Sequence, residues 1–179
     1  MTEAKQYSIL VDVERCIGCY ACEVACKQEH DLHGGFGWIK MVDTGAKDIG
    51  GKLKRDFVPT VCLHCGDPPC RHVCPSEAIK KDANGIVSIE ERLCTGCKLC
   101  LTACPVAALY YNHDKEVAEK CDLCTHLITR GLEPACVRNC PTEALYFGQT
   151  NAIINRIRER RIQSLFTHNN QVVYAVPLE

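Results

Sequence analysis

The sequence predicts an α+β fold in which two modules of similar design are interleaved along the chain and related by a pseudo-twofold axis. Two observations support this prediction. The chain of 179 residues contains 16 cysteines, and they fall into four short runs. The segments around these runs alternate between short strand patterns and turns, and the patterns recur from one run to another.

Composition narrows the class of protein before any motif is considered. A net charge of −1 gives no reason to expect nucleic acid or an anionic membrane as a partner. Cysteine makes up about 9% of the chain, a proportion typical of disulfide scaffolds and metal proteins. Without the cysteines, the apolar share falls from 46% to about 37%, which is modest for a packed core. We therefore expect bound metal to supply part of the stability of the fold.

The spacing of the cysteines is the most specific signal in the sequence. Runs I and III have the spacing C-x2-C-x2-C-x3-C, whereas run II widens one gap to four residues and run IV widens it to eleven. Pro75, Pro105 and Pro141 follow runs II, III and IV, and Lys27 follows run I. Runs I to IV are, in order, Cys16, Cys19, Cys22 and Cys26; Cys62, Cys65, Cys70 and Cys74; Cys94, Cys97, Cys100 and Cys104; and Cys121, Cys124, Cys136 and Cys140.

This spacing is that of bacterial ferredoxins, in which three cysteines hold one [4Fe–4S] cluster and the fourth binds the other cluster of a pair. Two-residue gaps let a tight loop direct three sulfurs at one cluster, while the fourth cysteine points away from it. Sixteen ligands fill four such sites with none left over, so we expect four [4Fe–4S] clusters and no catalytic residue. Zinc knuckles are a weaker alternative because they prefer well-separated C-x2-C pairs. A disulfide framework would need a secretion route that the sequence does not show.

The flanking segments predict which runs pair in space. Between runs II and III the chain reads as a helical turn after Cys74, a strand, a turn at Asn84-Gly85 and a second strand, which is the central span of a two-cluster ferredoxin. The strand pattern at 7–15 before run I resembles the one before run III, and 141–147 after run IV resembles the segment after run II. We therefore expect run II to pair with run III, and run I to pair with run IV.

This pairing predicts four ligand sets, in which each fourth cysteine crosses to the cluster of the partner run. It also predicts two ferredoxin-like modules, an outer one at 7–29 and 105–148 and an inner one at 56–104. A connecting loop or hairpin is expected at 30–55, and a C-terminal helix and strand at 149–179. The ligand sets are Cys16, Cys19, Cys22 and Cys140 for cluster A; Cys26, Cys121, Cys124 and Cys136 for cluster B; Cys62, Cys65, Cys70 and Cys104 for cluster C; and Cys74, Cys94, Cys97 and Cys100 for cluster D.

Two further segments carry local predictions. Thr150 is expected to cap a helix over 151–165, and 171–176 reads as a last strand that adds to a sheet. Trp38, the only tryptophan, falls in the connecting segment, which is either a docking element or a variable surface loop.

The motifs of runs II and IV resemble those of the four-cluster iron–sulfur subunits of the dimethyl-sulfoxide-reductase type. The resemblance covers about residues 7 to 147 and implies four clusters in a row, carrying electrons to or from a pterin-metal catalytic subunit. The short chain looks most like the relatives that accompany cytoplasmic tungsten enzymes, such as aldehyde oxidoreductases and class II benzoyl-CoA reductases. The motifs are Cys62-Leu63-His64-Cys65-Gly66-Asp67-Pro68-Pro69-Cys70 in run II, and in run IV Cys121-Asp122-Leu123-Cys124, Gly131 and Pro134-Ala135-Cys136-Val137.

The resemblance also implies the partners. The main partner would be a pterin-metal catalytic subunit with tungsten or molybdenum, and the second a flavoprotein subunit or a ferredoxin. Self-association into longer wires stays open, and the alternative function is a freestanding polyferredoxin that carries or stores electrons. No apolar stretch is long enough to span a membrane or to form a signal core, so we expect a cytoplasmic location and no direct membrane span.

The remaining polar residues leave two interpretations open. With every site filled by cysteine, we expect the seven histidines to be structural or exposed. Basic residues near cysteines either offset cluster charge and raise the reduction potentials or balance ordinary surface charge. These basic residues are Lys27, Arg71, Lys98, Lys120 and Arg138.

Overall fold

The computed structural model describes residues 7–33, 37–160, 162–164 and 172–177. Short helices and strands alternate along these residues, so the predicted mixture of α and β structure is confirmed. The strands are β1 (Tyr7–Asp12), β2 (Ile39–Ile49), β3 (Lys52–Val61), β4 (Ile79–Lys81), β5 (Val87–Ile89), β6 (Leu109–Asn112), β7 (Val117–Lys120), β8 (Leu145–Gln149), β9 (Ile162–Ser164) and β10 (Val172–Pro177). The helices are α1 (Ala21–Glu29), α2 (Pro69–His72), the 3-10 turn η1 (Glu91–Leu93), α3 (Leu99–Ala103), α4 (Thr125–Ile128), α5 (Ala135–Arg138) and α6 (Thr150–Arg160).

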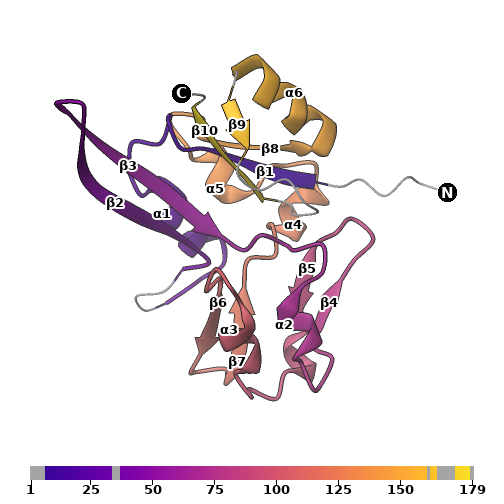
Figure 1. Cartoon of the computed structure of the whole chain (residues 1–179). Helices are drawn as coiled ribbons and strands as arrows, with labels where there is room; N and C mark the ends of the chain where they lie inside the picture. The colour runs from indigo at the N-terminus through magenta and orange to yellow at the C-terminus, as the bar shows by residue number, and fades with distance from the viewer. Residues whose placement is uncertain (1–6, 34–36, 161, 165–171, 178–179) are drawn as a thin grey trace.

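A four-stranded sheet in the order β8-β1-β10-β9 forms the upper part of the molecule in Figure 1. β1 pairs antiparallel with β8 and parallel with β10, so the segments before run I and after run IV lie side by side. Tyr7 stacks on Phe147 across this pair, with ring centroids 5.2 Å apart. α6 covers the sheet through Ile153, which is 2% exposed and packs against Leu10.

Three two-stranded hairpins, β2-β3, β4-β5 and β6-β7, make up the other strand pairs that the structure describes. The β4-β5 hairpin turns at the predicted Asn84-Gly85 position, where Gly85 has a φ of 83°. Asp82 helps to close this turn because its carboxylate accepts the Ile86 N–H at 2.7 Å. β4 to β7 lie with α2 and α3 in the lower part of Figure 1, so runs II and III share one end of the molecule.

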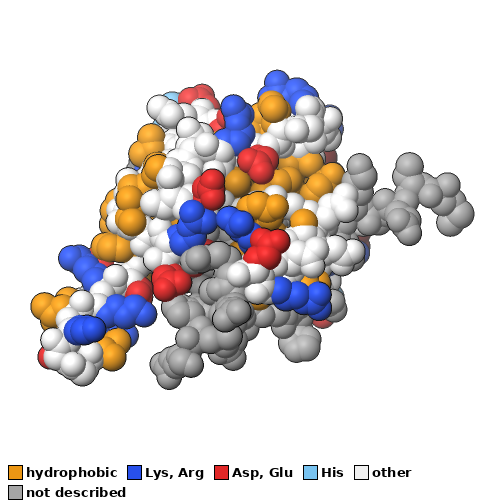
Figure 2. Space-filling view, turned by 90° about the horizontal axis from the view of Figure 1, so that it is seen from above, with side chains coloured by type: hydrophobic (Ala, Val, Ile, Leu, Met, Phe, Trp, Pro, Cys, Tyr) orange, Lys and Arg blue, Asp and Glu red, His pale blue; other side chains and the backbone are white. Residues whose placement is uncertain are grey.

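The β2-β3 hairpin is an arm that projects from the rest of the molecule (Figure 1). Arg55 Nε donates to Asp43 Oδ1 at 2.9 Å and fastens its two strands together. Figure 2 shows lysine and arginine side chains along the arm, and Ile49 and Leu53 near its tip are 59% and 81% exposed. The hairpin extends from Ile39 to Val61 and therefore passes the predicted boundary at residue 55, because β3 continues up to the first cysteine of run II.

Two local predictions differ from the structure. The residues after Cys74 form a turn and not a helical turn, because Glu77 adopts a left-handed φ of 51° that a helix cannot continue through. α6 ends at Arg160 and not at residue 165, because Ile162–Ser164 pair with β10 and exchange helical hydrogen bonds for those of a sheet. Trp38, in the connecting segment, is half-buried and packs against the main core.

The described residues form several apolar clusters, and cysteines take part in the two largest. The larger cluster joins Ile9 and Val11 of β1 to residues of runs I, II and IV. The smaller cluster joins Ile79, Val87 and Ala118 to cysteines of runs II and III. The cores therefore form around the sulfur atoms and not apart from them.

Candidate metal centres

The four cysteines predicted for cluster D line a single cavity. Burial raises the pKa of Cys100 in this group to about 11, and the thiols of Cys94 and Cys97 add to the rise. Cys74 differs, because hydrogen bonds from the Ser76 hydroxyl and from backbone N–H groups outweigh its burial and lower its pKa. The lining residues include Cys74, Cys94, Cys97, Cys100, Ile79 and Ile89.

A second cavity contains the four cysteines predicted for cluster C. Burial, and then the Cys62 thiol, raise the pKa of Cys70 to about 11. The same two causes raise the pKa of Cys65, with Cys104 adding to the effect. Cys104 thus acts from run III on thiols of run II. The lining residues include Cys62, His64, Cys65, Cys70, Val87 and Cys104.

The cysteines predicted for cluster A lie near one another although run IV is far from run I in sequence. Burial raises the pKa of Cys22 to about 12, and the thiols of Cys16 and Cys140 contribute to the rise. Burial raises the pKa of Cys16 as well, with Cys140 and Cys19 among the causes. α1 and α5 pack together and carry the end of run I and the end of run IV to the same place.

The cysteines predicted for cluster B form the most deeply buried group. Burial, with a contribution from the Cys124 thiol, raises the pKa of Cys26 to about 12. Burial and then the thiols of Cys26 and Cys124 raise the pKa of Cys136 far above its usual range. The pKa of Cys121 is raised likewise by burial and next by Cys62, so this group lies beside the one predicted for cluster C.

Backbone conformations repeat at equivalent positions of the runs. Gly18 in run I and Gly96 in run III have φ angles of 67° and 68°, and the residues after the next cysteine, Tyr20 and Lys98, have 62° and 64°. These left-handed residues turn the chain sharply so that three sulfurs of one loop face the same side. The turns that begin at the prolines after runs II, III and IV also share a feature, since the second residue after each proline is left-handed. These residues are Glu77, Ala107 and Glu143, with φ angles of 51°, 48° and 51°.

Backbone N–H groups point at the sulfur atoms. Ala144 N donates to Cys140 Sγ at 3.2 Å, and Ala108 N donates to Cys104 Sγ at 3.4 Å from the same place in the other turn. Such bonds stabilise a thiolate more than a thiol. Each turn therefore favours the thiolate form of its cysteine, which is the form that binds a metal.

These groups of thiols fit [4Fe–4S] clusters. Thiols that are buried close together lose their protons readily when a cation takes the place of those protons, as iron does. Buried donors aimed at the sulfurs complete the fit. When bound, such a cluster takes up and releases one electron at a time, and the cysteines would hold it by four Fe–S bonds.

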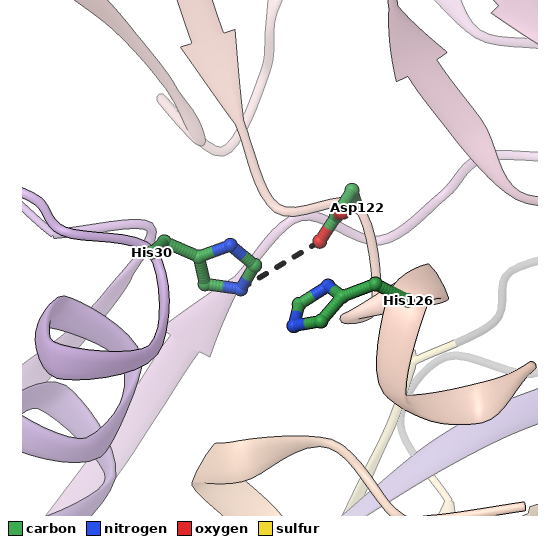
Figure 3. Close-up of side chains that lie close together, drawn as sticks. All are labelled: His30, Asp122 and His126. Atoms are coloured by element: carbon green, nitrogen blue, oxygen red, sulfur yellow. Dashed lines mark ion pairs between the residues drawn. The ribbon is translucent and has the colours of Figure 1, made fainter. Parts of the chain in front are cut away.

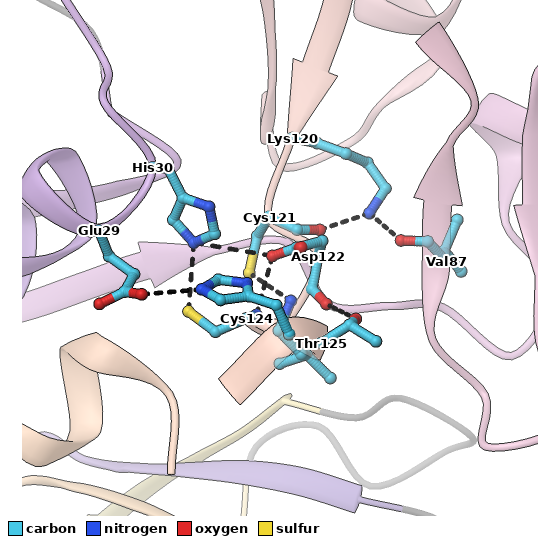
Figure 4. A network of polar contacts seen from close by, with 10 residues as sticks. Glu29, His30, Val87, Lys120, Cys121, Asp122, Cys124 and Thr125 are labelled. Carbon is cyan, nitrogen blue, oxygen red and sulfur yellow. Dashed lines mark hydrogen bonds and ion pairs between the residues drawn. The ribbon is translucent and has the colours of Figure 1, made fainter. Parts of the chain in front are cut away.

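One of the five basic residues near the runs is buried. Lys120 is 3% exposed, and its ammonium donates to the carbonyls of Val87 and Cys121, the latter at 2.6 Å (Figure 4). The pKa values of Cys70 and Cys121 are lowered by this ammonium against the larger effect of burial. For Lys120 the structure favours an electrostatic role at the clusters, whereas Lys27, Arg71, Lys98 and Arg138 are at least partly exposed.

Three side chains near run IV form a small polar group that sequence reasoning did not single out. Figure 3 shows His30, Asp122 and His126 facing one another, and one ligand atom of each lies within 4.8 Å of the others. His30 Nε2 also lies 3.2 Å from Cys124 Sγ, and His126 Nε2 lies 2.8 Å from Glu29 (Figure 4). Because His30 contacts a predicted cluster ligand, this polar group helps to hold the Cys124 side chain in position. The position of His30, four residues after Cys26 on the same helix face, is the signal that could have indicated it.

The class that the fold and these groups define is that of iron–sulfur proteins of the ferredoxin type. Two family models, each described as a 4Fe-4S dicluster domain, match residues 53–150 and 15–78 and together cover all four runs. This protein belongs to that family, and two dicluster domains correspond to four [4Fe–4S] clusters.

The curated relatives narrow the class further. The chain is 42% identical over 146 residues to a thiosulfate reductase electron transfer subunit of Salmonella typhi, with 80% of this chain and 76% of the relative covered. It is 36% identical over 153 residues to a subunit of the tetrathionate reductase of Salmonella typhimurium, with 85% and 61% covered. It is 37% identical over 154 residues to a component of the anaerobic dimethyl sulfoxide reductase of Escherichia coli, with 80% and 73% covered.

The protein thus groups with the iron–sulfur electron-transfer subunits of reductases, as the resemblance implied, and not with their catalytic subunits. It spans between 61% and 76% of the length of these three relatives. Among the described residues, no helix combines the length and the apolar character that crossing a bilayer requires.

Proposed function

We propose that this protein is the electron conduit of an oxidoreductase complex. Its clusters would connect a catalytic subunit that holds molybdenum or tungsten in a pterin cofactor with a second redox partner, either a flavoprotein subunit or a ferredoxin. The observation that carries the proposal is the gathering of cysteines from distant runs into groups of four. A cytoplasmic location stays part of the proposal.

The ligand sets A to D belong to this proposal. For clusters C and D the support is direct, because each predicted set of four cysteines lines one cavity. For clusters A and B the support comes from the effect of one predicted ligand on another. After burial, the Cys140 thiol contributes to the raised pKa of Cys16, and the Cys124 thiol contributes to the raised pKa of Cys26.

The interleaved modules are proposed on two further grounds. The antiparallel pair β1-β8 joins the segment before run I to the one after run IV, as the pair β4-β5 joins the equivalent segments of runs III and II. The repeated φ angles described above extend the likeness into the loops. One family match spans runs I and II, which are consecutive in sequence, so pairing in space needs its own test.

The groups follow one another in the order A, B, C, D. After burial, the Cys22 thiol contributes to the raised pKa of Cys136 across groups A and B, and the Cys62 thiol contributes to that of Cys121 across groups B and C. Groups C and D share runs II and III. A row of this kind suits transfer between partners at opposite ends, and the protein keeps water away from its middle, since all four cysteines of group B are buried.

Metal content and paired alanine variants test the ligand sets. We expect about sixteen irons and as much sulfide per chain in wild type, and about four fewer irons after Cys26→Ala or Cys136→Ala. Because both cysteines are assigned to cluster B, the double variant should lose no more than either single variant. The control pair, Cys26→Ala with Cys74→Ala, should lose two clusters. A loss of two clusters from the first pair would contradict the assignment.

The partner is tested by isolating the native complex. We expect a complex much larger than the 19.9 kDa chain, and mass spectrometry should identify a pterin-dependent subunit in it. A lone chain that holds four clusters would instead support a freestanding polyferredoxin. Zinc without sulfide would overturn both of these functions.

A further inference from the structure

His64 lies inside run II, between two predicted ligands of cluster C. Its ring is 0% exposed, and it lines the same cavity as Cys62, Cys65, Cys70 and Cys104. A completely buried imidazole must place both of its ring nitrogens against something, because a buried polar atom without a partner is costly.

One ring nitrogen has a clear partner. The Val87 backbone N–H donates to His64 Nδ1 at 3.0 Å, so Nδ1 is an acceptor and carries no proton. An imidazole whose Nδ1 accepts a hydrogen bond carries its proton on the other ring nitrogen. The single ring proton is therefore on Nε2.

The other ring nitrogen has no partner among the residues that the structure describes. Nε2 is buried and makes no hydrogen bond to them. Apart from His64, the side chains that line this cavity are apolar or belong to the four cysteines. The side-chain acceptors that the cavity offers to Nε2 are therefore sulfur atoms.

We propose that His64 donates its Nε2–H to a sulfur atom of the cluster held by Cys62, Cys65, Cys70 and Cys104. This inference rests on the proposed ligand set of cluster C. A hydrogen bond to a cluster sulfur stabilises the more negative, reduced state, and so it raises the reduction potential. His64 is thus a positioning residue that raises the potential of one cluster in the row and leaves the others alone.

Potentiometry on the loaded chain tests this role. We expect His64→Phe, which keeps a ring but removes the donor, to lower the midpoint potential of one cluster in an EPR-monitored titration. The matched control is His72→Phe in the same run, where the side chain is 62% exposed and pairs with Asp67; it should leave all four potentials in place. Unchanged potentials in a His64→Phe chain that holds about sixteen irons would overturn the inference.

A second measurement gives a result even if the His64→Phe chain does not fold. In protein labelled with ¹⁵N-histidine, we expect pulsed EPR to detect a nitrogen coupling to a reduced cluster. The coupling should persist in His30→Phe, which removes the imidazole beside Cys124, and it should vanish in His64→Phe. Absence of the coupling from a fully loaded His30→Phe chain would overturn the inference, even if His64→Phe failed to fold. A chain without iron and sulfide would instead refute the proposed function itself.

Discussion

Lys120 shows how one residue can act on two clusters. Its ammonium is buried against two backbone carbonyls, and no carboxylate pairs with it in the part of the chain that the structure describes. Its neighbour Glu119, also buried, instead pairs with Lys115 at 3.0 Å. The ammonium acts on Cys70 of group C and on Cys121 of group B, so its counter-charge would come from the metal-bound thiolates of both.

We therefore expect Lys120→Met to lower the midpoint potentials of two clusters at once. Methionine keeps most of the volume but removes a positive charge from a region of low dielectric constant, where charges interact strongly. The control is Lys98→Met, because Lys98 is exposed and solvent screens its charge; its effect should be much smaller and confined to one cluster. EPR-monitored titration measures both, and equal shifts in the two variants would contradict the assigned role of Lys120.

At this scale the sequence predicted the chemistry of the cysteines but not the neighbours that tune them. Spacing alone predicts that Cys62 and Cys65 are ligands, because the geometry of such a loop is local. The surroundings of His64 and Lys120 depend on the position of Val87, whose N–H donates to His64 and whose carbonyl accepts from Lys120. Val87 is distant from both residues in sequence and comes next to them only in the folded chain. The sequence therefore does not distinguish a buried basic residue beside a cysteine, such as Lys120, from an exposed one, such as Lys98.

At the scale of elements, the cysteine loops depend on close contacts between backbones. Gly96 in run III has a φ of 68°, and a β-carbon there would meet the carbonyl oxygen of Glu116 at 2.6 Å. Glu116 lies in the turn that joins β6 to β7. The loop of run III and this turn therefore fit together only if position 96 has no side chain.

Gly96→Ala should therefore destabilise the loop and the cluster that it holds. We expect a loss of about 1–3 kcal/mol from the left-handed conformation alone, and more from the clash with the carbonyl. Gly131→Ala is the matched control, because Gly131 has a φ of 75° but open space around it. Thermal unfolding followed by cluster absorbance should show the larger loss for Gly96→Ala. Equal losses would mean that the contact with Glu116 contributes nothing.

Helices, strands and turns were predictable where neighbouring residue types determine them, and less predictable where they depend on pairing with a distant strand. The turn at Asn84-Gly85 follows from residue type, and it occurs as expected. The end of α6 does not, because Ile162 continues the helical pattern and yet lies in β9, where β10 supplies its hydrogen bonds. Trp38 reads as a loop residue, but its ring lies 4.2 Å from that of His30 at the end of α1.

At the scale of the whole molecule, the cysteines hold together elements that are too short to be stable alone. α2, α4 and α5 have four residues each, far below the length at which an isolated helix persists in water. Cysteines belong to the two largest apolar clusters, so the packing around them depends on sulfur atoms staying in place. Group A also joins segments more than a hundred residues apart, through Cys16 and Cys140.

Removal of iron should therefore unfold the protein and not merely empty its sites. Binding energy released only in the folded state is part of the folding free energy. Without the cysteines, apolar residues make up about 37% of the chain, which is a modest basis for a core that has no bound metal. We expect oxidation followed by chelation to abolish far-UV circular dichroism typical of the native protein and to expose it to proteases. Restoring iron and sulfide under reducing conditions is the control, and it should recover both the spectrum and the resistance. An iron-free protein that kept its spectrum and its resistance would show that the short elements pack without their clusters, and the interleaved modules would then owe their stability to the sheet built on β1.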